Sequence, residues 1–251
     1  MMNMEMIKMI QPHIKVDNIN KYVLLPGDPG RIDKISAFLK DFREIKYNRE
    51  YRICEGYYED ARLSMMSSGI GCPAAAIAIE ELSNVGAKTI IRIGTCGGLI
   101  KGMQPGDIVI PYAAQCLDGT TREYDPSIEQ VQADRDVVSS LIAAAKDLGV
   151  KYFFGINRTH DAFYEPIENF IKLEGKRFVS SEMECSAVFL ISRLKNIRAG
   201  AILVVNTPEV PEEVRDDPDI IYRLVDEKKV QQGMDNAIKI SLEAIKKLRS
   251  I

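Results

Sequence analysis

The sequence contains no tryptophan, only two histidines, and five cysteines in 251 residues. The cysteines are odd in number and never show a Cys-x-x-Cys spacing, which predicts neither a disulfide framework nor a zinc site. No stretch approaches the ~20 apolar residues that cross a bilayer, and the Met-rich start lacks the apolar core of a signal peptide. We therefore expect reduced thiols in a cytoplasmic protein with no metal and no membrane contact.

Basic residues are not in excess either. The chain has 33 Lys and Arg against 36 Asp and Glu, a net charge of -3. A protein that binds the nucleic acid backbone usually carries a basic excess, so we expect no nucleic acid partner. With 46% hydrophobic and 27% charged residues, the composition is typical of a globular protein and still allows a local cationic pocket for a small anion.

Short apolar runs rich in β-branched residues alternate with longer amphipathic stretches. This pattern predicts an α/β fold: a single domain over 1–251, with three α/β/α layers around a central mixed, largely parallel, twisted sheet. We expect 1–11 to be a flexible extension. The expected strands are Tyr22 to Leu25, Leu63 to Ser67, Thr89 to Ile93, Ile108 to Pro111, Tyr152 to Ile156 and Ala201 to Val205. The expected helices are Ala74 to Val85, Val137 to Leu148, Glu184 to Leu194 and Ile221 to Leu248, and Gly86 and Gly149 are expected to end the first two.

Glycine-rich loops follow the first three expected strands, with the sequences GDPGR, SSGIG and GTCGG. In sheets of this kind ligands bind beyond the carboxyl ends of the strands, so we expect these loops to form one pocket. The segment from Thr207 to Asp219 combines prolines with acidic residues and is a candidate for a mobile lid over that pocket.

Two of these loops contain features that favour an anion. The turn from Gly27 to Arg31 offers backbone N–H groups and a guanidinium, although an ordinary strand-to-helix turn explains it equally well. Arg92 lies inside the apolar run from Thr89 to Ile93, and a buried arginine requires a partner. That partner is either a bound oxyanion, next to the Thr95 hydroxyl, or a structural carboxylate.

Five motifs together resemble the hexameric nucleoside phosphorylases, the family that contains uridine phosphorylases and the trimeric or hexameric purine nucleoside phosphorylases. They are GDPGR at 27–31, NRE at 48–50, RIGTCG at 92–97, DAFY at 161–164 and EMECSA at 182–187. The resemblance implies the fold of that family. It also implies a reaction in which phosphate, as co-substrate, attacks C1′ of a nucleoside and gives ribose 1-phosphate and the free base. Neither a metal nor an organic cofactor is implied.

The resemblance assigns roles to particular residues. Phosphate would be bound by Gly27, Arg31, Arg92 and Thr95 of one subunit and by Arg49 of a neighbour. Ribose would be bound by Met183, by Glu184 through the 2′- and 3′-hydroxyls, and by His13 across the interface. Arg92 and Glu184 would carry catalysis. Taken without the family, His13 and Arg49 are surface residues and the segment from Glu182 to Glu184 is an acidic helix N-terminus.

The base contacts implied are Cys96, Gly97, Phe163, Glu182 and Asn206, with a core aromatic as the alternative for Phe163. Purine-specific relatives use an aspartate where this chain has Asn206, and an amide has no titratable proton to donate. The uridine branch reads uracil with Gln and Arg, which correspond here to Ile167 and Asn169.

We expect uridine phosphorylase activity, with purine nucleoside phosphorolysis as the alternative. A nucleosidase or an inert nucleoside-binding protein ranks lower, because neither needs three converging arginines. The resemblance further implies a homo-oligomer with shared sites, three dimers in a ring.

Overall fold

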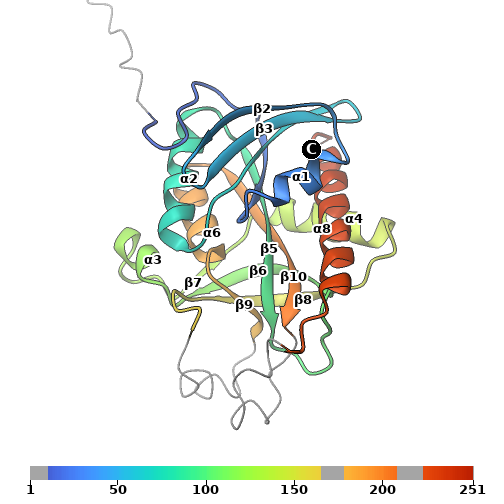
Figure 1. Ribbon diagram of the computed structural model, residues 1–251. Helices are drawn as coiled ribbons and strands as arrows, with labels where there is room; N and C mark the ends of the chain where they lie inside the picture. The colour runs from blue at the N-terminus through green and yellow to red at the C-terminus, as the bar shows by residue number, and fades with distance from the viewer. Residues whose placement is uncertain (1–10, 165–177, 208–222, 251) are drawn as a thin grey trace, which may run out of the picture.

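The computed structural model describes residues 11–164, 178–207 and 223–250, so most of the expected N-terminal extension lies outside it. The strands are β1 (Tyr22–Pro26), β2 (Lys40–Asn48), β3 (Tyr51–Tyr58), β4 (Ala61–Met66), β5 (Thr89–Gly98), β6 (Ile108–Cys116), β7 (Gln130–Gln132), β8 (Tyr152–Thr159), β9 (Phe178–Glu182) and β10 (Arg198–Thr207). The helices are α1 (Arg31–Ser36), α2 (Cys72–Asn84), α3 (Gly119–Tyr124), α4 (Arg135–Asp147), α6 (Cys185–Leu194) and α8 (Glu227–Leu248). Figure 1 shows α2, α3 and α6 on one side of the strands and α1, α4 and α8 on the other.

All these strands belong to one mixed sheet. Strands β4, β1, β5 and β10 run parallel to one another, and so do β6, β8 and β9. The two groups meet in antiparallel pairs, β10 with β6 and β5 with β9. Because β5 pairs with both β9 and β10, the strands β5, β10, β6, β8 and β9 close on themselves. The predicted α/β fold with a mixed sheet is confirmed, and this closure was not predicted.

The core has two parts, one on each face of the sheet. Along β10, Leu203 and Val205 pack in the cluster that contains residues of α2 and α6. Ile202 and Val204 pack in the cluster that contains residues of α4 and α8. Successive side chains of a strand point to opposite faces, so one apolar strand supplies both parts of the core. This arrangement gives the three predicted layers.

Five of the six predicted strands continue past their predicted carboxyl ends, whereas β4 ends at Met66, one residue before the predicted Ser67. β5 was expected to end at Ile93 and to leave Gly94 to Gly98 as a loop, but Gly97 and Gly98 pair with β9 and the stretch also pairs with β10. The long C-terminal helix begins at Glu227, where Asp226 accepts a hydrogen bond from the Lys229 backbone N–H. Its predicted start at Ile221 lies outside the described residues.

Other local predictions are confirmed or lie outside the described part. Gly86 and Gly149 follow α2 and α4 with φ angles of 113° and 66°, values that a glycine adopts without strain. Almost all of the expected lid, beyond Thr207, falls outside the described residues, as do Ile167 and Asn169. Among the helices that the structure describes, none has the length and apolar character needed to span a membrane.

Helix α8 packs on the loop before β6 through two glycines. A Cβ atom on Gly233 would lie 2.8 Å from the Gly106 Cα and closer still to its carbonyl oxygen. Alanine favours a helix over glycine by about 1 kcal/mol, whereas overpacking against backbone costs ~1–3 kcal/mol. We therefore expect Gly233→Ala to lower the free energy of unfolding by up to about 2 kcal/mol in chemical denaturation. Gln232→Ala, on the exposed side of the same helix, should change it by less than about 0.5 kcal/mol, and a stabilised Gly233→Ala would contradict this packing argument.

Candidate active site

The loops after β1 and β4 lie side by side at the carboxyl end of the parallel strands. The backbone N–H of Ser68 donates to the Pro26 carbonyl at 2.9 Å, and that of Gly69 donates to the Gly27 carbonyl at 3.0 Å. The end of β5 lies beside β1, because Pro26 is in register with Ile93. The predicted convergence of the glycine-rich segments is therefore present, although the third of them is strand rather than loop.

Arg92 is buried at this end of the sheet, with 3% of its surface exposed. Its Nε donates to Glu182 Oε2 at 3.1 Å and its Nη2 donates to Glu184 Oε2. Burial alone would lower the pKa of Arg92, but the two carboxylates outweigh it and raise that pKa. Gly94 leaves room for the side chain, since a Cβ there would lie 2.8 Å from Nη2. Structural carboxylates, one of the two predicted kinds of partner for Arg92, thus account for two of its three side-chain nitrogens.

The third nitrogen of Arg92 is available. Nη1 is buried and has no hydrogen-bond partner among the described residues, and it lies 3.9 Å from the position of a Cβ on Gly27. Arg31 lies nearby and donates from its own Nη1 to the Ile93 carbonyl at 2.8 Å. Burial, and secondly the charge of Arg92, lower the pKa of Arg31 to about 10. The positive charges of these two neighbouring guanidinium groups repel each other, and an anion bound beside them would offset that repulsion.

Glu184 lies directly against this cationic group. Its Oε1 accepts the backbone N–H of Gly71 at 2.6 Å and its Oε2 accepts Arg92. Burial raises the pKa of Glu184, the charge of Arg92 partly offsets this, and the neighbouring Glu182 adds to the rise. The adjacent Met183 is half-buried, and its carbonyl accepts the Cys72 thiol at 3.2 Å. The start of α2 therefore fixes the predicted ribose segment, a role for Gly71 and Cys72 that the sequence did not predict.

A β-bulge brings three of the predicted base contacts together. Val205 is in register with Cys96 and Thr207 with Gly97, so Asn206 is the inserted residue between them. Such a bulge redirects a side chain next to a site. Thr95, the predicted hydroxyl of the phosphate site, is half-buried just before this point.

Phe163, another predicted base contact, lies on the loop after β8. It is 65% exposed and makes an edge contact with Tyr164, with ring centroids 5.1 Å apart. The core-aromatic alternative for Phe163 is therefore wrong.

His13 and Arg49 belong to neighbouring segments of the chain. His13 contacts Glu81, with 2.6 Å between Nδ1 and Oε1, and at about 1.5 Å of rise per residue Glu81 lies roughly 14 Å along α2 from Cys72. Arg49 is exposed at the β2–β3 turn with a φ of 56°, and the preceding Asn48 donates to the His13 carbonyl at 2.7 Å. One chain thus places the turn that carries Arg49 next to His13.

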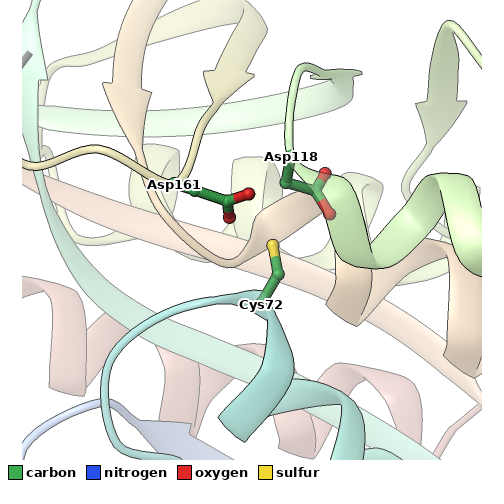
Figure 2. A group of neighbouring side chains, drawn as sticks. All are labelled: Cys72, Asp118 and Asp161. Carbon is green, nitrogen blue, oxygen red and sulfur yellow. The ribbon is translucent and has the colours of Figure 1, made fainter.

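One group of possible metal ligands exists among the described residues. The ligand atoms of Cys72, Asp118 and Asp161 lie within 4.8 Å of one another, and Figure 2 shows the side chains pointing together. Each already bonds to protein: Asp118 caps α3 and accepts the Ser186 hydroxyl, and Asp161 accepts the Gly119 N–H at 2.8 Å. Burial and the Asp118 charge raise the pKa of the Cys72 thiol, which disfavours the thiolate that a metal binds. Internal hydrogen bonding accounts for this cluster.

The sequence model of the family described as Phosphorylase superfamily matches residues 21–246. The chain belongs to this superfamily. The predicted class of enzyme, a phosphate-dependent nucleoside phosphorylase, is confirmed.

Similar superfamily members carry different substrate names. The chain is 35% identical to a guanosine phosphorylase of Halorubrum lacusprofundi, covering 94% of this chain and 98% of that protein. It is 38% identical to a uridine phosphorylase of Thermococcus kodakarensis, covering 81% and 79%. Among solved structures, a Toxoplasma gondii purine nucleoside phosphorylase in complex with immucillin-H superposes with a TM-score of 0.85 at 32% identity, covering 100% and 99%. These names do not agree on the base.

Proposed function

We propose that the chain cleaves nucleosides with inorganic phosphate and that uridine is its preferred substrate. The observation that supports phosphate most directly is the buried Nη1 of Arg92, which has no partner among the described residues and lies beside Gly27 and Arg31. A phosphate dianion is bound by two or three cationic donors of this kind. A hydrolytic enzyme activates water instead and gains nothing from this pair.

In the proposed reaction a phosphate oxygen forms a bond to C1′ while the bond from C1′ to the base nitrogen breaks. Electrons of the broken bond leave with the base, and positive charge develops on the ribose ring. Arg31 and Arg92 hold the nucleophile in place, and the buried Glu184 lies where it can stabilise the sugar. Each Glu184 oxygen already accepts one hydrogen bond and has a further acceptor position for a ribose hydroxyl.

The choice of uridine rests on Asn206. This residue is at the β10 bulge, in register between Cys96 and Gly97, where purine-specific relatives are expected to have an acid. Without that acid the departing purine lacks the proton donor that purine-specific relatives are expected to use. Purine nucleosides are the second candidate, because relatives of similar identity and coverage are named for guanosine and for purine nucleosides.

The shared surface of His13 and Arg49 supports a homo-oligomer. His13 is held by Glu81, and its carbonyl accepts the side chain of Asn48, the residue before the exposed Arg49. We infer that these two residues complete a site in a second copy. We therefore propose a ring of three dimers, which the mass in solution tests directly.

A nucleoside panel tests the function. We expect release of uracil from uridine only when phosphate is present, with slower cleavage of inosine and guanosine. Base release would be followed chromatographically with and without phosphate. Cleavage without phosphate would indicate a nucleosidase, faster cleavage of inosine or guanosine would overturn the uridine preference, and no cleavage of any nucleoside in the panel would overturn the proposal.

A further inference from the structure

Glu182 is a buried carboxylate whose oxygens are all occupied within the protein. Its Oε1 accepts Asn157 Nδ2 and Thr159 Oγ1, each at 2.7 Å. Its Oε2 accepts Arg92 Nε at 3.1 Å and the backbone N–H groups of Glu184 and Cys185, both at 2.9 Å. A carboxylate has about four acceptor positions, so no lone pair of Glu182 remains for the base. This geometry disfavours the base contact expected for it from the sequence.

The hydrogen bonds of Glu182 connect the proposed phosphate position with the proposed ribose position. One goes to the arginine beside the proposed phosphate position, and others go to the backbone of the segment that carries the proposed ribose carboxylate. We propose that Glu182 is a positioning residue for Arg92, and that Asn157 and Thr159 of β8 hold Glu182 in place. This proposal rests on the proposed function only for the identity of the anion at Arg92.

The planarity of the guanidinium group explains how positioning works. Nε of Arg92 is fixed by Glu182 and Nη2 is fixed by Glu184. Two fixed nitrogens determine the plane, and therefore the direction, of Nη1, which makes no bond to the described residues. An arginine side chain has many rotamers, so losing the Nε contact would let Nη1 leave its place beside Gly27.

The partners of Glu182 are themselves fixed. Thr159 is opposite Glu182 in the β8–β9 pair, and its hydroxyl also accepts the Ser186 N–H at 3.1 Å. Asn157 accepts the Ser180 hydroxyl at 2.8 Å through its side-chain oxygen. Each of these side chains is buried. A complete buried network of this kind specifies one arrangement, and removal of one hydroxyl leaves its former partners unsatisfied.

The test compares two substitutions of Thr159, one that removes its hydroxyl and one that keeps it. Thr159→Val keeps the shape and removes the hydroxyl, whereas Thr159→Ser keeps the hydroxyl. We expect Thr159→Val to weaken inorganic phosphate binding about tenfold in calorimetry and to raise the phosphate KM to match, with Thr159→Ser within about twofold of wild type. Ser192→Ala, in α6, is the control, because the buried hydroxyl of Ser192 has no hydrogen-bond partner among the described residues. It should leave phosphate binding unchanged.

Three results would overturn the positioning role. The first is unchanged phosphate binding and an unchanged Tm in Thr159→Val. The second is a weakening of phosphate binding in Thr159→Ser as large as that in Thr159→Val. The third is a lower Tm of Thr159→Val with intact phosphate binding, which would leave Thr159 a merely structural role. A wild-type protein that binds phosphate without cleaving nucleosides would refute the proposed function instead, and the phosphate affinities of the variants would still decide the role of Glu182. A wild-type protein that binds no phosphate would refute both.

Discussion

Arg92→Ala is expected to lower kcat/KM for phosphate-dependent cleavage by about 10³-fold or more. Loss of one preorganised donor to a developing or bound anion costs ~10²–10³ in rate, and Arg92 also orients Glu184. The substitution leaves Glu182 and Glu184 buried without their cation, which costs ~3–5 kcal/mol in the free energy of unfolding. Kinetics at several phosphate concentrations and chemical denaturation measure the two effects separately.

A matched control separates the site from the general loss of a charge. Arg62 is an exposed arginine that pairs with Glu55 on the far end of the sheet, and Arg62→Ala should keep wild-type kinetics and lose at most about 1 kcal/mol. If Arg92→Ala were folded, destabilised and nearly fully active at low phosphate, Arg92 would be only a structural partner of the two carboxylates. The phosphate site would then have to lie elsewhere.

The sequence located Arg92 because a charge inside an apolar strand is unusual and requires a partner. Asn157 and Thr159 are polar residues in the buried second half of β8, but the predicted strand ended at Ile156, so the same reasoning did not reach them. Their common partner could not be found in this way. β9 is a short strand, and it lies beside β5 and β8 only because the sheet closes on itself.

Pairing between distant segments also explains the other differences. Glycines normally interrupt strands, so the stretch from Gly94 to Gly98 reads as a loop, and only β9 and β10 on either side make it a strand. The contact of His13 with Glu81 joins residues far apart in sequence, so no spacing rule predicts it. By contrast, the turn at Gly27 and the helix ends at Gly86 and Gly149 depend on local conformation and were predicted correctly.

Glu184→Gln is expected to lower kcat about 100-fold without weakening phosphate binding. The amide keeps the size of the side chain but has one acceptor oxygen in place of two, so it cannot serve Gly71, Arg92 and both ribose hydroxyls. It also removes the negative charge that balances the positive charge developing on the sugar. The one amide oxygen can still accept Arg92 Nη2 and keep the guanidinium in place, so with a negative charge next to Arg92 lost, phosphate affinity should stay the same or rise. Steady-state kinetics and phosphate calorimetry measure these two effects.

The pH dependence adds a second test of the same residue. Burial raises the pKa of Glu184, so wild-type activity that needs the ionised form should be full above that pKa and be lost as the pH falls through it. Glu184→Gln has no such group and should lack this acid limb. Glu80→Ala, at a half-exposed carboxylate paired with Lys195, should keep both the rate and the limb. If Glu184→Gln instead raised the phosphate KM as Arg92→Ala does and left kcat unchanged, Glu184 would act only by holding Arg92.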